Sequence, residues 1–366
     1  MNKLTTLTLL LVGLLAPVVM AEDVNAGKPQ QSIVGAIRWD AWYGDAGIAK
    51  GETEQNSPGL IVERTLAPAH WHYRIPFYAK TIGENKVEFR GNSPDVMDKE
   101  IAYASEAGLD YWAFLTYPPQ SPLSAAFDLY LASKRKSEIK FCVILHHIRE
   151  TPEEVARITG YIKESQYAKV LAGRPLVYAF QCKAGKPFYD DLLMAAAEAG
   201  LKRPYLVNMD ACSTQVKWDA VSSYTGKGGK GMWDRQKQGQ KVIPSVSAGW
   251  DPRPRIETPN PWSQYYGNTK GKMKLGRLRS AETDAVEIAD GVKSALLWNR
   301  QNPGAGEAKA VVIYAWNEFD EGGWICPTLS EGTRRLDAIS KVLKEDEKIT
   351  HHTSAGDGAT RASPEK

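Results

Sequence analysis

From residue 31 onward, the chain alternates apolar, strand-like runs with helix-like segments. Several runs, including residues 141–145 and 311–315, are continuously apolar, as is typical of parallel strands buried on both faces. Eight strands with intervening crossovers predict an α/β fold, a (β/α)8 TIM barrel. The predicted strands are residues 33–38, 109–115, 140–145, 175–180, 205–209, 220–224, 242–246 and 310–316.

An open, doubly wound sheet is the alternative architecture for the same pattern. No GxGxxG or P-loop motif follows a predicted strand, which lowers that alternative and favours the barrel. Ser93 as N-cap and Pro94 after it predict one helix start. Thr151 and Glu154 predict another, because their spacing fits a capping box. Further helices are expected at residues 124–137, 188–199, 282–299 and 334–344, whereas 213–218 and 227–240 are poor helix candidates.

The two ends of the chain differ in composition from the rest. Residues 1–21 combine a basic start, an apolar stretch at 4–19 and small residues before Glu22, which predicts a cleaved secretory signal peptide. We therefore expect an exported protein, periplasmic or secreted, with no membrane span after signal removal. Residues 22–345 are expected to form a single catalytic barrel, and the polar residues 346–366 a disordered tail.

Two segments are far longer than ordinary loops between a strand and a helix. Residues 41–92 separate the first strand from its helix, and residues 247–281 follow the seventh strand. Long loops in a compact domain are usually functional or disordered. We expect these two loops after barrel strands to shape a substrate site.

Charge and cysteine content narrow the classes of partner. The formal net charge is +3, close to neutral for 366 residues, which argues against a nucleic-acid partner. The four cysteines lack zinc-motif spacing, and neither metal nor cofactor is predicted. Cys182 and Cys212 could be neighbours and form a disulfide, but free thiols are favoured. His70 with His72 could chelate a metal, although hydrogen bonding or a structural role is favoured for them and for His146 and His147.

Polar and aromatic residues gather where the predicted strands end. In a parallel barrel these carboxyl ends form the active site. Glu318 directly follows a buried strand and Glu321 comes three residues later, so both can converge on one bound sugar. Glycoside cleavage needs such a pair, and the low-dielectric floor would raise the pKa of one member. A solvated acidic turn before Gly322 is the alternative.

Other rim residues are candidates for substrate contact, and we favour Trp42 and Trp250 as sugar-stacking platforms, although core packing is the commoner use of tryptophan. Arg255 could bind an acidic sugar or sulfate, or pair with Asp251. The predicted substrate-binding residues are Asp40, Trp42, Tyr117, His146, Asp210, Trp250, Asp251, Arg255 and Asn317.

The segment 317–322, Asn-Glu-Phe-Asp-Glu-Gly, resembles the Asn-Glu-Trp-x-Glu-Gly signature of the glycoside hydrolase family 99-like barrels. That group includes the endo-α-mannosidases and the WbsX-like proteins of bacterial polysaccharide loci. Residues 97–111, 173–176 and 249–255 also resemble family segments, so the similarity covers about residues 33 to 330.

The resemblance implies distinct roles for the two acids. Glu318 would take the proton of the sugar 2-hydroxyl, which attacks the anomeric carbon to give a 1,2-anhydro sugar. Glu321 would protonate the leaving group and later assist water, with net retention. Phe319 replaces the usual Trp and Asp320 replaces the His of the mannosidases, so the analogy does not extend to the sugar.

Three function classes fit a barrel of this kind. An exported glycoside hydrolase acting on a poly- or oligosaccharide fits the leader and the two acids. A WbsX-like glycosyltransferase would need an activated, cytoplasmic sugar donor, which the predicted leader argues against. A non-catalytic glycan-binding barrel would keep the aromatic rim without needing both acids. The sequence favours the hydrolase.

Overall fold

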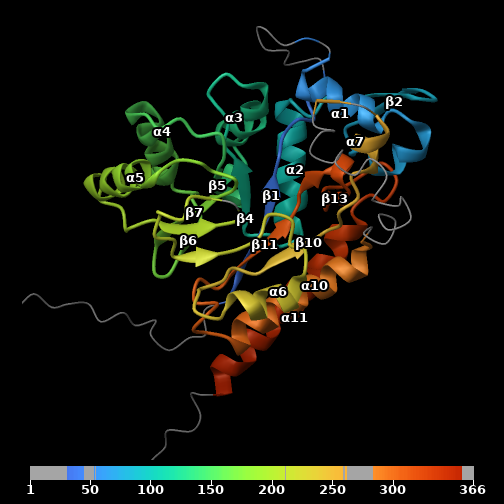
Figure 1. The fold of residues 1–366 in the computed structure, drawn as a ribbon. Coiled ribbons are helices and arrows are strands. Elements are labelled where there is room, and N and C mark those ends of the chain that lie inside the picture. Colours follow the sequence, from blue (N-terminus) through green and yellow to red (C-terminus); the bar gives the residue numbers. More distant parts are fainter. Residues whose placement is uncertain are drawn as a thin grey trace, which may run out of the picture.

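The structure is a computed structural model that describes residues 31–44, 53, 55–210, 212–258, 260–261 and 283–356, with side chains described to residue 350. The predicted leader and most of the predicted loop 247–281, including Trp262, lie outside these residues. Figure 1 shows a curled sheet surrounded by helices.

The sheet confirms the predicted barrel. All eight predicted strands are present, and each strand neighbour along the sheet is parallel. A parallel bridge between Val221 and Val242 links the two ends of the strand order. The strands in spatial order are β10 (Ser245–Ser247), β11 (Ala310–Tyr314), β1 (Ile33–Arg38), β4 (Tyr111–Leu115), β5 (Lys140–Leu145), β7 (Arg174–Ala179), β8 (Tyr205–Asn208) and β9 (Ala220–Val221); β6 (Lys169–Val170) is antiparallel to β7.

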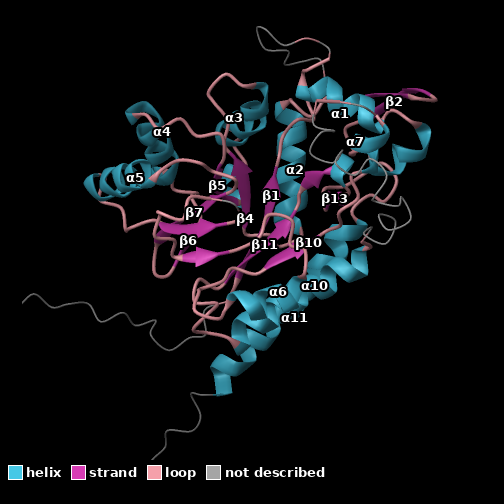
Figure 2. Cartoon of the chain, in the orientation of Figure 1, coloured by secondary structure: helices cyan, strands magenta, loops and turns pink. Residues whose placement is uncertain are grey.

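Helices pack around this sheet (Figure 2). Ser93 caps its helix as predicted, accepting from the Val96 amide at 3.3 Å. Thr151 accepts from the Glu154 amide, but the Glu154 carboxylate binds Arg157 at 2.9 Å, so the predicted capping box is only half formed. The main helices are α2 (Pro94–Glu106), α3 (Ala125–Ala132), α4 (Pro152–Lys163), α5 (Lys186–Glu198), α6 (Gly229–Gln236), α10 (Ala285–Gln301) and α11 (Arg334–Gly356).

Two helices differ from the sequence-based expectation. Residues 227–240 contain α6, although two glycines within it disfavour a helix. Trp233 of α6 is buried and donates to the Ser245 carbonyl at 3.2 Å, so tertiary packing outweighs the weak propensity. Helix α11 continues to Gly356, past residue 345 where a disordered tail was expected. Asp346 lies on this extension and forms an ion pair with Arg300 of α10.

The segment after β1 folds as a small insertion over the carboxyl end of the barrel. It contains α1 (Pro58–Leu66), the 3-10 helix η1 (Ala69–Arg74), and the hairpin of β2 (Lys80–Gly83) and β3 (Lys86–Glu88). Helix α1 packs against α7 (Arg253–Glu257), which follows β10, and both contact the turn η5 (Phe319–Glu321) after β11. The described parts of the two long segments therefore meet at the end of β11.

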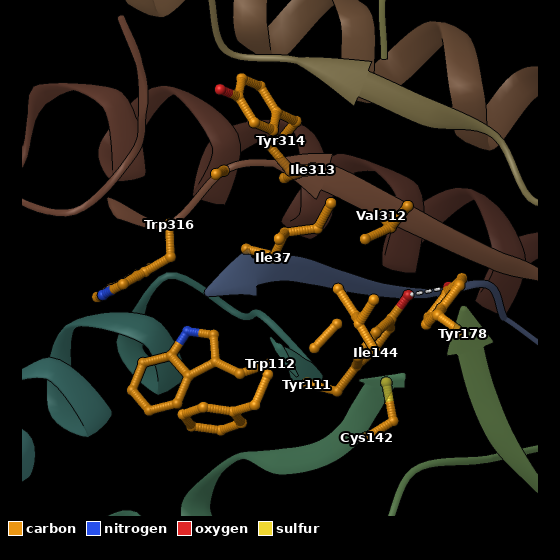
Figure 3. Close-up of a cluster of buried hydrophobic side chains, with 14 of the residues drawn as sticks. Ile37, Tyr111, Trp112, Cys142, Ile144, Tyr178, Val312, Ile313, Tyr314 and Trp316 are labelled. Carbon is orange, nitrogen blue, oxygen red and sulfur yellow. Dashed lines mark hydrogen bonds between the residues drawn. The ribbon is translucent and has the colours of Figure 1, made fainter. Parts of the chain in front are cut away.

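Large buried side chains pack against the strands of the barrel, as Figure 3 shows. The hydroxyl of Tyr111 lies 2.9 Å from that of Tyr178 and donates to the Val311 carbonyl. A Cβ on Gly35 would lie 2.5 Å from the Tyr111 ring, so only glycine fits there. Among the described residues, no helix is long and apolar enough to cross a membrane.

Candidate active site

The chain turns sharply after β11. Asn317–Glu318 (β12) pairs antiparallel with Gly323–Trp324 (β13), and η5 forms the connection. Gly322 has a φ of 83°, and a Cβ there would lie 2.6 Å from the Asp251 amide nitrogen, so both its conformation and its close contact require glycine. The tight turn places Glu318, Asp320 and Glu321 together, and all three are buried.

Arg255 of α7 lies among these three acids. Its Nε and Nη2 donate to the two Asp320 oxygens at 2.6 and 2.8 Å, and Nη1 contacts Glu321 Oε1. Its Nη2 also lies 3.5 Å from Glu318 Oε2. The sequence left open a pair between Arg255 and Asp251; in the structure Asp251 instead binds Arg253 and Arg74.

Two buried tyrosines hold the remaining oxygens of the pair. Tyr224, beyond β9, donates to Glu318 Oε1 at 3.0 Å, and Tyr314 of β11 donates to Glu321 Oε2 at 2.5 Å. Burial raises the pKa of each phenol well above its usual value, and the neighbouring carboxylates raise it further. Both hydroxyls therefore stay protonated and act as donors to the two glutamates.

The pKa of Glu318 differs from that of an ordinary glutamate. Burial raises its pKa well above the usual value, and the charges of Glu321 and Asp320 raise it further. Arg255 and the hydrogen bond from Tyr224 act in the opposite direction but do not cancel the increase. A carboxyl with this environment holds or accepts a proton more readily than an ordinary glutamate, as acid–base catalysis requires.

Asp40 and Asn317 belong to a buried polar network beside the pair. The Asn317 amide donates to Asp40 at 2.8 Å, and its oxygen accepts from the Trp39 amide at 3.0 Å. Asp40 also binds Arg38, which binds Glu100 of α2 at 2.9 Å. The sequence predicted both residues as substrate contacts; the structure places them where they orient the strand end that carries Glu318.

Aromatic rings follow one another around the barrel mouth. Trp39 donates to the Tyr117 hydroxyl at 2.8 Å, and Tyr117 lies edge-on to His146. The row continues through Phe180, which stacks on both His146 and Tyr224. Tyr314 and then Trp250 complete it. We call this set the aromatic arc: Trp39, Tyr117, His146, Phe180, Tyr224, Tyr314 and Trp250.

Three predicted sugar contacts, Tyr117, His146 and Trp250, are half-buried members of the aromatic arc. Burial lowers the pKa of His146 to about 4, so its ring is neutral at neutral pH. Trp42 has only 3% of its surface exposed and packs edge-on against Phe319 at 4.8 Å. The structure thus places Trp42 in the core rather than at the rim.

The remaining predicted residues lie at the edges of the site. Asp210 is exposed and accepts from the Tyr224 amide at 3.0 Å, so it fixes the Tyr224 backbone. Asp251 is fully buried between two arginines. Sequence reasoning missed Tyr224, Arg74 and Arg253, because only folding brings their segments to the turn after β11. It also missed Tyr314, which lies within the apolar run of β11 itself.

The histidines and cysteines carry other roles. His70 pairs with Glu257 at 3.0 Å, while His72 binds the Ala67 carbonyl. In the part of the chain that the structure describes, no three His, Cys, Asp or Glu side chains are grouped to hold a metal ion. Cys182 and Cys212 are both free thiols.

A cavity of about 400 Å³ lies at the other end of the barrel. Its walls include Ala220, which begins β9, and Ala305, which precedes β11, so it opens at the amino ends of the strands. Since barrel enzymes act at the carboxyl ends, this cavity is separate from the candidate active site.

Two solved structures share the fold of this chain. Both are of the glycoside hydrolase family 99 endo-α-mannosidase from Bacteroides thetaiotaomicron. One is 16% identical, with a TM-score of 0.54, and the other, bound to bis-tris propane, is 15% identical, with a TM-score of 0.51. Each match covers 87% of this chain and 98% of the other. No family model matches the sequence, and no curated protein does. These likenesses confirm that the chain has the predicted barrel fold, as found in a family 99 enzyme.

Proposed function

We propose that this protein is a glycoside hydrolase that cleaves a poly- or oligosaccharide, with Glu318 and Glu321 as its catalytic carboxylates. The observation that carries the proposal is the buried acidic turn at the carboxyl end of the barrel, where Asp320 joins the pair around Arg255. Burying several acids beside one cation costs several kcal/mol and does not help a barrel to fold. Such a cost is typical of a functional site. The fold shared with endo-α-mannosidases supports this chemistry.

The site can support the route that the sequence resemblance implies. Glu318 accepts the proton of the sugar 2-hydroxyl while O2 bonds to the anomeric carbon, and Glu321 gives a proton to the departing oxygen. Water then opens the 1,2-anhydro ring at the anomeric carbon and loses a proton to Glu321, and O2 recovers its proton from Glu318. The raised pKa of Glu318 supports its role as base, because a carboxylate with a higher pKa takes up a proton more readily.

Substrate contact is proposed for the half-buried side of the aromatic arc. Tyr117, His146 and Trp250 present rings and polar edges around the acidic turn, and His146 is neutral. Aromatic faces bind the apolar C–H faces of sugars, and the polar ring edges can contact hydroxyls. Because Asp320 stands where the mannosidases have His, the sugar need not be mannose.

The first test is incubation of the purified protein with a library of poly- and oligosaccharides. We expect new reducing ends with the wild type, and losses of at least about a hundredfold in E318Q and E321Q. Binding without products would identify a glycan-binding barrel instead. Activity that requires a nucleotide sugar would identify a glycosyltransferase.

The stereochemistry of the first product tests the route itself. NMR of the hydrolysate at early times should show an anomer with the configuration of the cleaved bond. Initial release of the inverted anomer would exclude the anhydro-sugar intermediate while leaving hydrolysis intact.

Export is also proposed, from the predicted leader at residues 1–21. Expression of the full-length chain in a bacterial host should give a periplasmic or secreted protein whose mature N-terminus is Glu22. A cytoplasmic protein that retains Met1 would contradict export.

A further inference from the structure

Arg255 makes the most concentrated set of ionic contacts in the described site. Its guanidinium binds Asp320 through two nitrogens, contacts Glu321 through the third, and lies 3.5 Å from Glu318. Only 5% of Arg255 is exposed, so solvent screens these charges poorly. A planar fork can serve several carboxylates at once, which a lysine ammonium cannot do in the same geometry.

The α7 segment that carries Arg255 is tied directly to the acidic turn. The Asp251 amide donates to the Glu321 carbonyl at 2.6 Å. The Asp251 side chain is held by Arg74 and Arg253, and the Arg255 guanidinium lies over the Trp39 ring at 5.0 Å. Its own contacts with Asp320, Glu321 and Trp39 fix the position of the guanidinium, as a site for precise proton transfer requires.

Among the described residues, Arg255 is the cation that lies beside the Glu318 carboxyl group. The other neighbours are the acids Glu321 and Asp320 and the phenols Tyr224 and Tyr117. Tyr314 faces Glu321 from β11. Burial and the two acids raise the pKa of Glu318, and Arg255 opposes them.

We propose that Arg255 is a positioning residue of the catalytic pair, which fixes the carboxyl groups of Asp320 and Glu321 and provides the positive charge that allows Glu318 to ionise as a base. This role differs from the substrate contact that the sequence suggested. It rests on the proposed function for its catalytic meaning, but its electrostatic content can be measured without a substrate.

Two substitutions separate the charge of Arg255 from its geometry. R255Q removes the charge, so the pKa of Glu318 should rise further. R255K keeps a charge on a flexible stem that cannot reproduce the fork, so the rise should be smaller. R253Q and R253K are matched controls, because Arg253 lies on the same helix and is also buried but binds Asp251.

The experiment is a pH titration of the protein labelled with 13C at glutamate side-chain carboxyls, with the Glu318 signal assigned from E318Q. We expect the Glu318 midpoint to move to higher pH in R255Q, by less in R255K, and not in either Arg253 variant. An unchanged midpoint in R255Q, or an equal shift in R253Q, would overturn the proposal. Should R255Q not fold, the R255K and R253K pair carries the same comparison, and equal midpoints in those two variants overturn it.

The outcome is separable from that of the proposed function. An upward shift in R255Q without hydrolysis of any glycan would support the electrostatic role of Arg255 and count against the hydrolase. Hydrolysis that depends on Glu318, with no shift in R255Q, would overturn this inference alone.

Discussion

The hydroxyl of Tyr224 donates a hydrogen bond to Oε1 of Glu318 at 3.0 Å. The two residues are 94 positions apart and extend from the ends of β9 and β11, which are not neighbours in the sheet. The bond therefore passes the carboxyl end of β10, which lies between β9 and β11 in the closed barrel. Since Tyr224 stacks on Phe180, with ring centroids 4.0 Å apart, the donor is held by the aromatic arc.

Removing this donor should weaken Glu318 as a base. Y224F leaves the ring in place but removes a hydrogen bond that stabilises the ionised carboxyl, so the pKa of Glu318 should rise. The activity lost as pH falls should then be lost at higher pH than in the wild type. A hydrogen bond to a charged group contributes about 1.5–3 kcal/mol, so kcat/KM at neutral pH should drop about 10- to 100-fold. A pH–rate profile of Y224F identical to that of the wild type would contradict this assignment.

Two tryptophans that the sequence treated alike should behave differently. W42A removes a core ring packed on Phe319 and should lower the free energy of unfolding by about 3–5 kcal/mol. W250A removes a half-buried ring of the aromatic arc and should raise KM about 2- to 10-fold with a smaller loss of stability. Denaturant unfolding and steady-state kinetics of both variants check this, and equal stability losses would refute it.

The buried network behind Asn317 should be important for stability as well as for activity. R38M leaves Asp40 and Glu100 without their shared cation, and breaking such a buried pair typically costs about 3–5 kcal/mol. N317A removes a neutral member and should cost less stability, but it should lower kcat because it frees the strand end before Glu318. If N317A kept the wild-type kcat, the orienting role of Asn317 would be wrong.

The Asp251 carboxylate should contribute a pH-dependent part of the stability. Burial opposes its ionisation, but contacts with Arg253 and Arg74 outweigh burial and lower its pKa. A group with a lowered folded-state pKa stabilises the protein above its unfolded-state pKa, about 3.9, and that contribution is lost as pH falls through the folded-state value. The stability gap between wild type and D251N should thus be full at neutral pH and shrink below about pH 4. A gap that stays constant down to about pH 2 would contradict the ionic role.

Most of the barrel could be predicted because each strand has a recognisable pattern in its own local sequence. A strand buried on both faces is expected to be apolar, and residues 141–145 of β5 and 310–314 of β11 are buried and follow this pattern. Helix α6 could not be predicted in this way, since its glycines disfavour a helix and its anchor, Trp233, contacts a carbonyl of β10. The extension of α11 likewise depends on a partner, Arg300, in another helix.

The residues of the candidate site also fall into two groups, those with a local sequence signal and those without one. Glu318 and Glu321 could be found because one strand end and one short motif place them together. The contact of Arg255 with Glu321 joins residues 66 positions apart, and the Tyr224 bond spans 94, so neither has a local signal. Trp42 shows that a local signal can also mislead. It follows a strand end, but Phe89 of the insertion and Phe319 of η5 cover its ring.

The most direct test of the account is the kcat/KM of E318Q and E321Q on the first glycan that the wild type is found to hydrolyse. Both substitutions are close in size to glutamate and remove a titratable proton site. We predict that each lowers kcat/KM by at least about a hundredfold while the variants remain folded. Wild-type activity in both variants would contradict the central claim that these two carboxyl groups carry the reaction.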